Sequence, residues 1–425
     1  MGELKDLLSF YKEYLNKEML PFWISSLDDK YGGVYTCYNN EGSTLLSKDK
    51  YTWSQGRMIW VLSRLALLCR EGVIEGDAIL YEQHAAKSVR FLLDHVFLEN
   101  GNCAFLLSES GEKKESILGQ GYDTSFYADC FVVLGFTEYS RLSQDEGILH
   151  QAVQLYDRIS ERLQSGNVRS EPYPIPEGVK AHAVSMIMLN VTQELADAAE
   201  SLNHSESSRL RKMSLFYLEE IMGTFCQADG SIAEMIPSDS RLQDTVLCRH
   251  LAPGHTLECM WFAMTEARKL GRKDIVEQGA LVVKRAFSLG WDAEYGGLFR
   301  YVDRDGGEPK GSRSGHGYET LVSETWDMKI WWPHSEALYS LLFAYDCTQD
   351  DQFMAYYEQM HQYVFETFPN SNKQIGEWIQ IRNRQGEPIQ KLVALPLKDP
   401  YHILRNIILI IELLNRNKEE KNLHE

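Results

Sequence analysis

The sequence predicts an all-α protein, a closed (α/α)6 barrel of about twelve helices with short β-hairpin insertions. Segments with helical spacing of apolar residues come in pairs, and a Gly-marked β segment recurs about every 60 to 85 residues, which is typical of a repeat architecture. No Pro-, Ser- or charge-rich linker divides the chain. We therefore expect residues 1–425 to form a single closed domain rather than an open solenoid with polar caps.

The individual elements follow from local patterns. Amphipathic or apolar helical spacing predicts helices at 4–20, 52–68, 76–96, 123–142, 145–163, 181–199, 205–225, 255–270, 273–288, 333–347, 351–368 and 400–415. Gly-rich alternating segments predict hairpins or turns at 28–36, 99–105, 227–231, 291–299 and 375–379. Tyr31-Gly32-Gly33 and Tyr295-Gly296-Gly297 closely match, which supports a repeated module.

Composition excludes several classes of function. The chain has 43 Lys and Arg against 61 Asp and Glu, a formal net charge of -18, so no basic surface for nucleic acid is expected. It contains no apolar stretch of about 18 residues and no apolar signal-peptide core at its start, so we expect neither a membrane span nor secretion. Eight scattered cysteines without a CxxC motif are typical of a reduced, cytoplasmic protein.

The barrel architecture predicts where a site lies. The inner helices of such a barrel are parallel, so their N-termini gather at one mouth, and we expect these starts near Thr52, Asp123, Lys180, Pro253, Pro333 and Pro400. Conspicuous polar and aromatic residues stand at or near these starts: Arg57, Tyr122, Asp123, His255, Glu258, Trp331, Trp332, His334, Glu336, Asp399 and His402. Asp399 is expected to cap the last inner helix. A mouth with this composition suits a neutral polyhydroxylated ligand such as a sugar.

His255 and Glu258 illustrate the two interpretations open at this point. They are three residues apart, so they share one face of the first helical turn. The positive end of the helix dipole would keep His255 a neutral base near pH 7. Considered alone, His255 and Glu258 would be a surface histidine with an acidic neighbour. In the same way, Arg57 could belong to a structural ion pair, and Trp331-Trp332 could be a packed corner of the chain. Their common place at one mouth favours a functional site.

Four motifs carry a resemblance to a known family. Residues 50–57 (Lys-Tyr-Thr-Trp-Ser-Gln-Gly-Arg), 253–258 (Pro-Gly-His-Thr-Leu-Glu), 328–337 (Met-Lys-Ile-Trp-Trp-Pro-His-Ser-Glu-Ala) and 401–405 (Tyr-His-Ile-Leu-Arg) resemble N-acylglucosamine 2-epimerases. The motifs stand in the same order over nearly the whole chain. The family has an (α/α)6 barrel fold and includes cellobiose 2-epimerases, mannose 2-epimerases and aldose–ketose isomerases.

The resemblance implies interconversion of N-acylglucosamine and N-acylmannosamine by two catalytic histidines, His255 and His402. One would take the proton from carbon 2 to give an enediolate, and the other would return a proton to the opposite face. Glu258 would orient His255 or another sugar-facing group, and Arg57 would stabilise the enediolate oxygen. The remaining substrate-binding candidates are Trp331, Glu336, Tyr122, Trp53 and His334.

The same resemblance bears on cofactors and assembly. The proton transfer requires no cofactor and no metal, and the sequence has no Cys/His cluster with zinc spacing. Some members of the family bind adenine nucleotides as effectors and form homodimers. We therefore expect a homodimer, and adenine nucleotides are candidate effectors, although the chain has no Gly-rich phosphate loop.

Departures from the family pattern leave the substrate open. Lys180-Ala181-His182 stands where mammalian-type acylglucosamine epimerases have Glu-Pro-Met, and Asp399-Pro400 replaces a Gly-rich motif. Ile187 and Asn190 stand where relatives acting on unmodified sugars often carry His and Glu. The leading alternative is the same chemistry on mannose, glucose, fructose or a glucose-containing disaccharide. A glycoside hydrolase using Asp123 and Glu258 would leave both histidines unexplained, and a non-catalytic sugar-binding protein would not need them.

Overall fold

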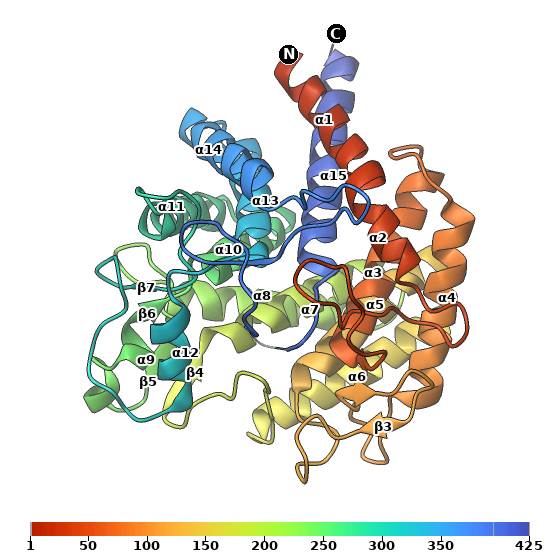
Figure 1. Ribbon diagram of the computed structural model, residues 1–425, viewed down its shortest axis with the longest axis horizontal. Helices are drawn as coiled ribbons and strands as arrows, with labels where there is room; N and C mark the ends of the chain where they lie inside the picture. Colours follow the sequence, from red (N-terminus) through yellow and green to blue (C-terminus); the bar gives the residue numbers. More distant parts are fainter. Residues whose placement is uncertain (1, 394, 425) are drawn as a thin grey trace.

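A computed structural model describes residues 2–393 and 395–424 of the protein and confirms the (α/α)6 barrel (Figure 1). Six inner helices form a closed ring in which each packs on the next and the last packs on the first. In ring order they are α3 (Thr52–Arg70), α5 (Phe126–Ser143), α7 (His182–Ser201), α10 (Pro253–Lys269), α13 (Trp331–Thr348) and α15 (Tyr401–His424).

An outer helix packs against each inner helix. The outer helices are α1 (Gly2–Tyr14), α4 (Ala78–His95), α6 (Glu146–Gln164), α8 (Ser207–Glu220), α11 (Lys273–Gly290) and α14 (Asp351–Thr367). Burial separates the two layers, because inner helices such as α3 are buried nearly all round, whereas α6 buries one stripe of residues. That stripe is Leu149, Ala152, Val153, Leu155, Tyr156 and Ile159.

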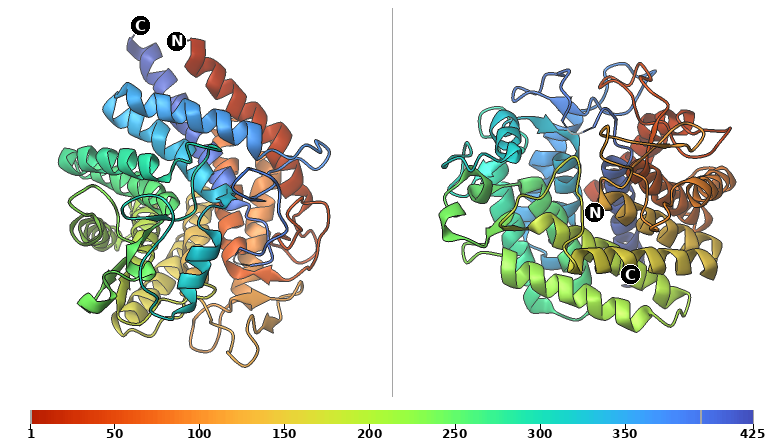
Figure 2. Two further views of the ribbon diagram at one scale, coloured as in Figure 1. Left: turned by 60° about the vertical axis from the view of Figure 1, so that its left-hand side comes forward. Right: turned by 90° about the horizontal axis from the view of Figure 1, so that it is seen from below.

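The first and last helices close the ring from opposite ends of the sequence. The inner helix α15 packs on both α3 and the N-terminal α1, so the two ends of the chain lie side by side (Figures 1 and 2). Among the described residues, none of the helices combines the length and the apolar character needed to cross a membrane.

The predicted hairpins are shorter than expected. At the five predicted positions the chain makes a tight turn closed by one antiparallel bridge, for example between Leu27 and Val34 and between Trp291 and Leu298. The short strands form elsewhere. In each small sheet, a strand just before an inner helix pairs with a strand in a neighbouring loop. The strands are β1 (Lys50–Tyr51), β2 (Leu106–Leu107) and β3 (Lys113–Lys114); β4 (Val179–Ala181) with β5 (Met235–Pro237); β6 (His250–Leu251) with β7 (Val302–Asp303); and β8 (Lys329–Ile330) with β9 (Ile381–Arg382).

Several elements were not expected from the sequence pattern. Short helices α9 (Val246–Arg249) and α12 (Gly317–Thr325) lie in loops, and a 3-10 turn spans Ser240–Leu242. The first predicted helix is three pieces, because a π-helical turn at Leu15–Met19 separates α1 from α2 (Leu20–Ser25). A second π-helical turn, Ile221–Phe225, extends α8. Such insertions shift the helical phase and blur the periodic signal.

Candidate active site

A cavity of about 210 Å³ lies at the predicted mouth of the barrel. The first turns of all six inner helices line it, and two loops add apolar side chains at its rim. Residues from the helices are Trp53, Arg57, Tyr127, Phe131, Ala183, Met186, Ile187, His255, Glu258, Phe262, Trp331, Trp332 and His402. The convergence of inner-helix starts, predicted from the sequence, therefore forms an actual pocket.

A larger hollow of about 540 Å³ lies at the opposite mouth, where the inner helices end. Its charged groups neutralise one another, since Arg64 pairs with Glu138 and Glu412, and Lys269 pairs with Asp197. Among the residues that the structure describes, no histidine lines this hollow. The mouth at the helix N-termini is therefore the better place to seek proton-transfer chemistry.

His255 lies in the first turn of α10 and is held by a carboxylate that the sequence analysis did not identify. Its Nδ1 lies 3.0 Å from Oε2 of Glu234, which follows the turn after α8. A carboxylate accepts, so Nδ1 carries the proton and Nε2 is left for the cavity. Burial alone would lower the pKa of His255, but the charge and hydrogen bond of Glu234 raise it above its ordinary value. The direction of this pKa shift is opposite to the one expected from the helix dipole.

Glu234 in turn is kept ionised by its neighbours. Burial would raise the pKa of this carboxyl group, but His255 and His182 hold it well below the ordinary value. His182 is fully buried, with its Nδ1 3.6 Å from Oε1 of Glu234. The arrangement gives His255 a permanent negative partner on the side away from the cavity.

His402 has the corresponding arrangement in the first turn of α15. Its Nδ1 lies 2.7 Å from Oε1 of Glu336, one turn into α13. Arg405 donates to the same oxygen at 2.7 Å and to Oε1 of Glu258 at 2.5 Å. Burial would raise the pKa of Glu336, but Arg405 and His402 lower it to about 2, so this carboxylate is also ionised.

The expected role of Glu258 therefore changes. It lies in the cavity wall as predicted, but its hydrogen-bond partner is Arg405 and not His255. Three residues separate Glu258 from His255 along α10, which places the two on one face without making them touch. Glu234 makes the contact that was expected of Glu258.

The carboxylates beside His402 raise the question of a metal. Ligand atoms of Glu258, Glu336 and His402 all lie within 4.8 Å of one another, close enough for one ion. Arg405 already donates to both carboxylates and supplies the positive charge that the cluster needs. The group is therefore an ion-pair network that fixes His402.

Trp332 lies against both histidines. Its ring centroid is 5.0 Å from that of His255 and 5.8 Å from that of His402. Gly254 makes this packing feasible, because a β-carbon there would lie only 2.6 Å from Cζ3 of Trp332. The indole thus packs against both histidine rings.

Arg57 extends from α3 into the cavity, and its guanidinium group packs on aromatic rings. Its guanidinium carbon lies 3.9 Å from the ring centroid of Phe131, and its Nη1 lies 3.4 Å from Oδ1 of Asp399. Asp399 caps α15 as predicted, accepting from the backbone N–H groups of Tyr401 and His402. The other Asp399 oxygen accepts from Nε1 of Trp331 at 3.0 Å.

Of the other expected site residues, Trp53 lines the cavity. Glu336 does not line it, because it is fully buried behind His402, so it is not in a position to bind the sugar as expected. His334 and Tyr122 do not line it either. His334 is fully buried, and both its ring nitrogens serve the fold: Nδ1 donates to the Ile330 carbonyl, and Nε2 accepts from the Leu298 N–H. Burial lowers the pKa of His334 to about 3. Tyr122 precedes α5 by four residues, is 41% exposed and is absent from the cavity wall. Both positions correct the sequence-based expectation.

Sequence reasoning also missed functional positions outside the motifs. Glu234 lies in the loop after α8 and Arg300 in the loop after α11, where no periodic pattern marks them. Arg405 and Trp332 lie inside the quoted motifs but had no assigned role. The one sequence signal that points to Glu234 is an acidic residue shortly after the turn at Gly230.

The fold and these contacts define an (α/α)6-barrel protein whose mouth holds two histidines, each bound to a carboxylate. Comparison with known proteins gives the family: the model for N-acylglucosamine 2-epimerase (GlcNAc 2-epimerase) matches residues 33–406, and the chain belongs to this family of carbohydrate isomerases. The N-acylglucosamine 2-epimerase of Bos taurus is 26% identical, covering 98% of this chain and 94% of that protein.

More distant relatives extend the comparison to other sugars. The cellobiose 2-epimerase of Dictyoglomus turgidum is 22% identical, covering 96% of this chain and 99% of that protein. The structure of a cellobiose 2-epimerase from Bacillus thermoamylovorans superposes with a TM-score of 0.76 at 19% identity, covering 96% of this chain and 99% of that one. At this identity the structural likeness establishes the fold.

Proposed function

We propose that the protein is a 2-epimerase that interconverts N-acylglucosamine and N-acylmannosamine. The observation that carries this proposal is the pair of histidines, His255 and His402, that line one cavity, each with Nδ1 bound to an ionised carboxylate. Each ring is left with Nε2 for a proton of the substrate, and the ionised partner stabilises the imidazolium that forms when the ring accepts it.

The proposed reaction uses the open-chain sugar. One histidine removes the proton from carbon 2, and the bonding electron pair moves toward carbon 1, so that the aldehyde oxygen becomes the anionic oxygen of an enolate. On an unmodified sugar, whose carbon 2 carries a hydroxyl, the same step gives an enediolate. Arg57 stabilises the anionic oxygen. The other histidine gives its proton to the opposite face of carbon 2, the aldehyde re-forms, and the configuration is inverted. Trp331 and Glu258, both in the cavity wall, hold the sugar, and Glu336 acts through His402.

The wall contributed by the third inner helix supports the N-acyl substrate. Ala181, Ala183, Met186 and Ile187 line the cavity there and present only apolar atoms from their side chains. The methyl group of an acyl chain gains from burial against such a surface, whereas a bare hydroxyl would lose its hydrogen bonds to water.

We also propose the finer properties that the family resemblance suggests. The reaction needs no metal or other cofactor, the enzyme works in the cytoplasm as a homodimer, and adenine nucleotides are candidate effectors. The eight free cysteines are consistent with a reducing compartment. Sedimentation analysis with and without ATP tests the assembly and the effector together.

The test of the activity is proton NMR in D2O with N-acetylmannosamine, N-acetylglucosamine and mannose in turn. We expect deuterium at carbon 2 of both N-acetyl sugars and the appearance of both epimers. His402→Asn and His255→Asn should each slow the conversion of one epimer into the other by a factor of about 100 or more. The matched control is His150→Asn, an exposed histidine hydrogen-bonded to Gln154, which should exchange at the normal rate.

Other outcomes discriminate among the alternatives. Exchange confined to mannose, with glucose or fructose as product, would assign the enzyme to unmodified sugars. Formation of the opposite epimer at the normal rate in either histidine variant would refute the two-histidine mechanism.

A further inference from the structure

Arg300 is the cavity cation without an acidic partner. It is only 3% exposed, lines the cavity, and has no carboxylate within ion-pair distance among the described residues. The other two site arginines differ, since Arg57 pairs with Asp399, and Arg405 pairs with Glu258 and Glu336. The positive charge of Arg300 therefore remains uncompensated inside the protein.

Neutral groups hold this guanidinium in place. Nη1 donates to Oγ1 of Thr325 at 3.0 Å, and Nη2 donates to the Tyr173 hydroxyl at 3.3 Å, while Nε has no partner among the described residues. A guanidinium has five N–H donors, so these two bonds leave donors for a ligand. Tyr173 also donates to the Val393 carbonyl, which links Arg300 to the loops at the cavity rim.

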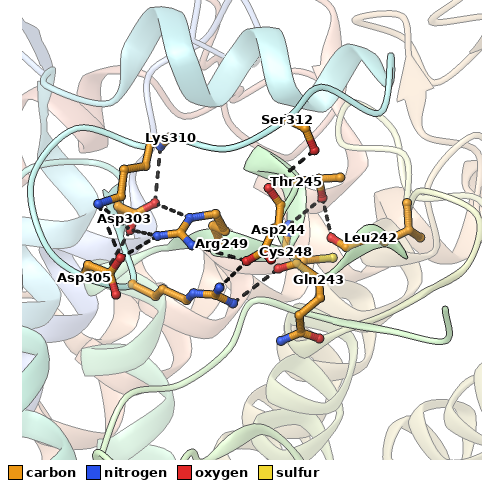
Figure 3. A network of polar contacts seen from close by, with 11 residues as sticks. Leu242, Gln243, Asp244, Thr245, Cys248, Arg249, Asp303, Asp305, Lys310 and Ser312 are labelled. Carbon is orange, nitrogen blue, oxygen red and sulfur yellow. Dashed lines mark hydrogen bonds and ion pairs between the residues drawn. The ribbon is translucent and has the colours of Figure 1, made fainter. Parts of the chain in front are cut away.

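The backbone that carries Arg300 is fixed. The Arg300 N–H donates to the Trp326 carbonyl, and β7 begins two residues later. At the end of β7, the buried Asp303 is held by Arg249, which also pairs with Asp305, and Lys310 reaches the same two acids (Figure 3). This network ties β7 to α9, the short helix that leads into β6 and α10. Arg300 and His255 both line the cavity. The charge of Arg300 lowers the pKa of His255, against the larger effect of Glu234, which raises it.

A substrate that enters the cavity displaces water from the guanidinium. A neutral sugar would leave the charge desolvated and unpaired, whereas an anionic group would form charge-assisted hydrogen bonds with the donors that remain. Burial raises the pKa of the neighbouring Tyr173 to about 12, so its hydroxyl remains a neutral donor and does not compensate the charge.

We propose that Arg300 is a specificity-determining residue that binds an anionic group, a carboxylate or a phosphate, carried by the sugar substrate. This inference rests on the proposed 2-epimerase function and narrows its substrate to acidic N-acyl sugars. Proton transfer at carbon 2 is unchanged, and Arg300 supplies the contact that selects the substrate.

The experiment measures kcat/KM from carbon-2 deuterium exchange and Kd by calorimetry for four sugars. They are N-acetylmannosamine, its 6-phosphate, its 6-carboxylate (the uronic acid) and N-succinylmannosamine, whose acyl chain ends in a carboxylate. The proteins are the wild type, Arg300→Gln, Arg300→Lys and the control Arg304→Gln, which removes a neighbouring arginine that pairs with Asp244 outside the cavity.

We expect at least one anionic sugar to exceed N-acetylmannosamine in kcat/KM by about 30-fold or more in the wild type. Arg300→Gln should abolish this preference through KM and Kd, Arg300→Lys should retain part of it, and Arg304→Gln should retain all of it. Which sugar is preferred identifies the source of the anion. A purely structural role of Arg300 would lower kcat/KM for neutral and anionic sugars alike.

The remaining outcomes separate the two proposals. If kcat/KM for exchange were at least as high with N-acetylmannosamine as with every anionic sugar, the role of Arg300 would be overturned. The epimerase function would remain intact. If none of the anionic sugars bound more tightly than N-acetylmannosamine, calorimetry alone would overturn the role of Arg300. Tight, Arg300-dependent binding of an anionic sugar without exchange at carbon 2 would support the anion site and refute the epimerase function.

Discussion

Glu234 controls the protonation of His255, and this makes the pH profile of the enzyme a direct test of their contact. Its carboxylate raises the pKa of a buried imidazole that would otherwise fall below its ordinary value. In Glu234→Gln the charge is gone and burial dominates, so the limb of the pH–rate profile that belongs to His255 should move to lower pH. We also expect kcat to fall by about 100-fold, because the ring loses its fixed tautomer and the partner of its imidazolium.

The pH profile of kcat/KM, together with histidine NMR titration, measures this effect. Glu366→Gln, on the exposed face of α14, is the matched control and should leave both unchanged. An unchanged limb in Glu234→Gln would mean that the charge of Glu234 does not govern His255.

Gly254 tests whether the position of Trp332 matters for catalysis. An alanine there would place its β-carbon 2.6 Å from Cζ3 of Trp332 and 2.7 Å from Cβ of Pro333, so the indole must shift away from the two histidines. We expect Gly254→Ala to lower kcat by about 10-fold or more, while overpacking costs roughly 1–3 kcal/mol of stability. Steady-state kinetics beside urea unfolding measure the two effects. A normal kcat in a stably folded Gly254→Ala variant would show that the position of Trp332 does not matter for catalysis.

At the scale of elements, the contact of α3 with α5 depends on two glycines. A β-carbon at Gly56 would lie 2.2 Å from the Phe131 carbonyl oxygen, and one at Gly135 would lie 2.5 Å from the Gly56 carbonyl oxygen. The two helices thus approach through their backbones, and this approach sets the position of Arg57, the next residue along α3.

Gly56→Ala should therefore force the helices apart. We expect it to lower the free energy of unfolding by about 3 kcal/mol or more, at the upper end of overpacking effects, because backbone atoms cannot rotate away as a side chain can. Urea unfolding measures this, with Gly223→Ala as control, since a β-carbon at Gly223 meets no atom within 4 Å. Equal stability of the two variants would show that the α3–α5 contact is looser than the structure indicates.

At the scale of the whole molecule, the same kind of buried ion pair recurs in three of the helical modules. A lysine just before an inner helix binds an acid in the turn after the preceding outer helix: Lys50 with Asp28, Lys329 with Asp292, and Lys398 with Glu377. All six side chains are at most 2% exposed. Each pair ties the end of an outer helix to the start of the next inner helix, at the mouth that holds the site.

Asp292→Asn tests the contribution of one such pair. It leaves Lys329 buried without its counter-charge, so we expect a loss of about 3–5 kcal/mol at pH 7. Burial would raise the pKa of Asp292, but Arg384 and Lys329 lower it to about 2. A carboxyl group with a lowered pKa stabilises the fold above its ordinary pKa and loses this effect as pH falls toward the folded value.

The difference in unfolding free energy between the wild type and Asp292→Asn should therefore shrink between about pH 4 and pH 2. Urea unfolding over this range measures it, and Asp274→Asn, an exposed acid paired with Arg272, serves as the surface control that leaves stability unchanged. A difference that does not vary with pH would contradict the assigned charge state.

The sequence by itself determined the barrel, the approximate start of each inner helix and the mouth where His255, His402, Arg57 and Trp331 gather. Apolar periodicity and helix-start signals are local, so they survive without knowledge of the tertiary structure. The predicted hairpins are turns closed by single bridges, and the first helix continues through a π-helical turn to Ser25, beyond its predicted end.

Only the tertiary structure decided which groups touch. Glu234 lies 21 residues before His255 and Glu336 lies 66 before His402, so no local spacing predicts either bond. His334 and Tyr122 show the converse, since a position near the start of an inner helix does not by itself turn a side chain toward the cavity. The unpaired charge of Arg300 is likewise decided by the tertiary structure, because only the residues that the fold places around it show whether the charge has a partner.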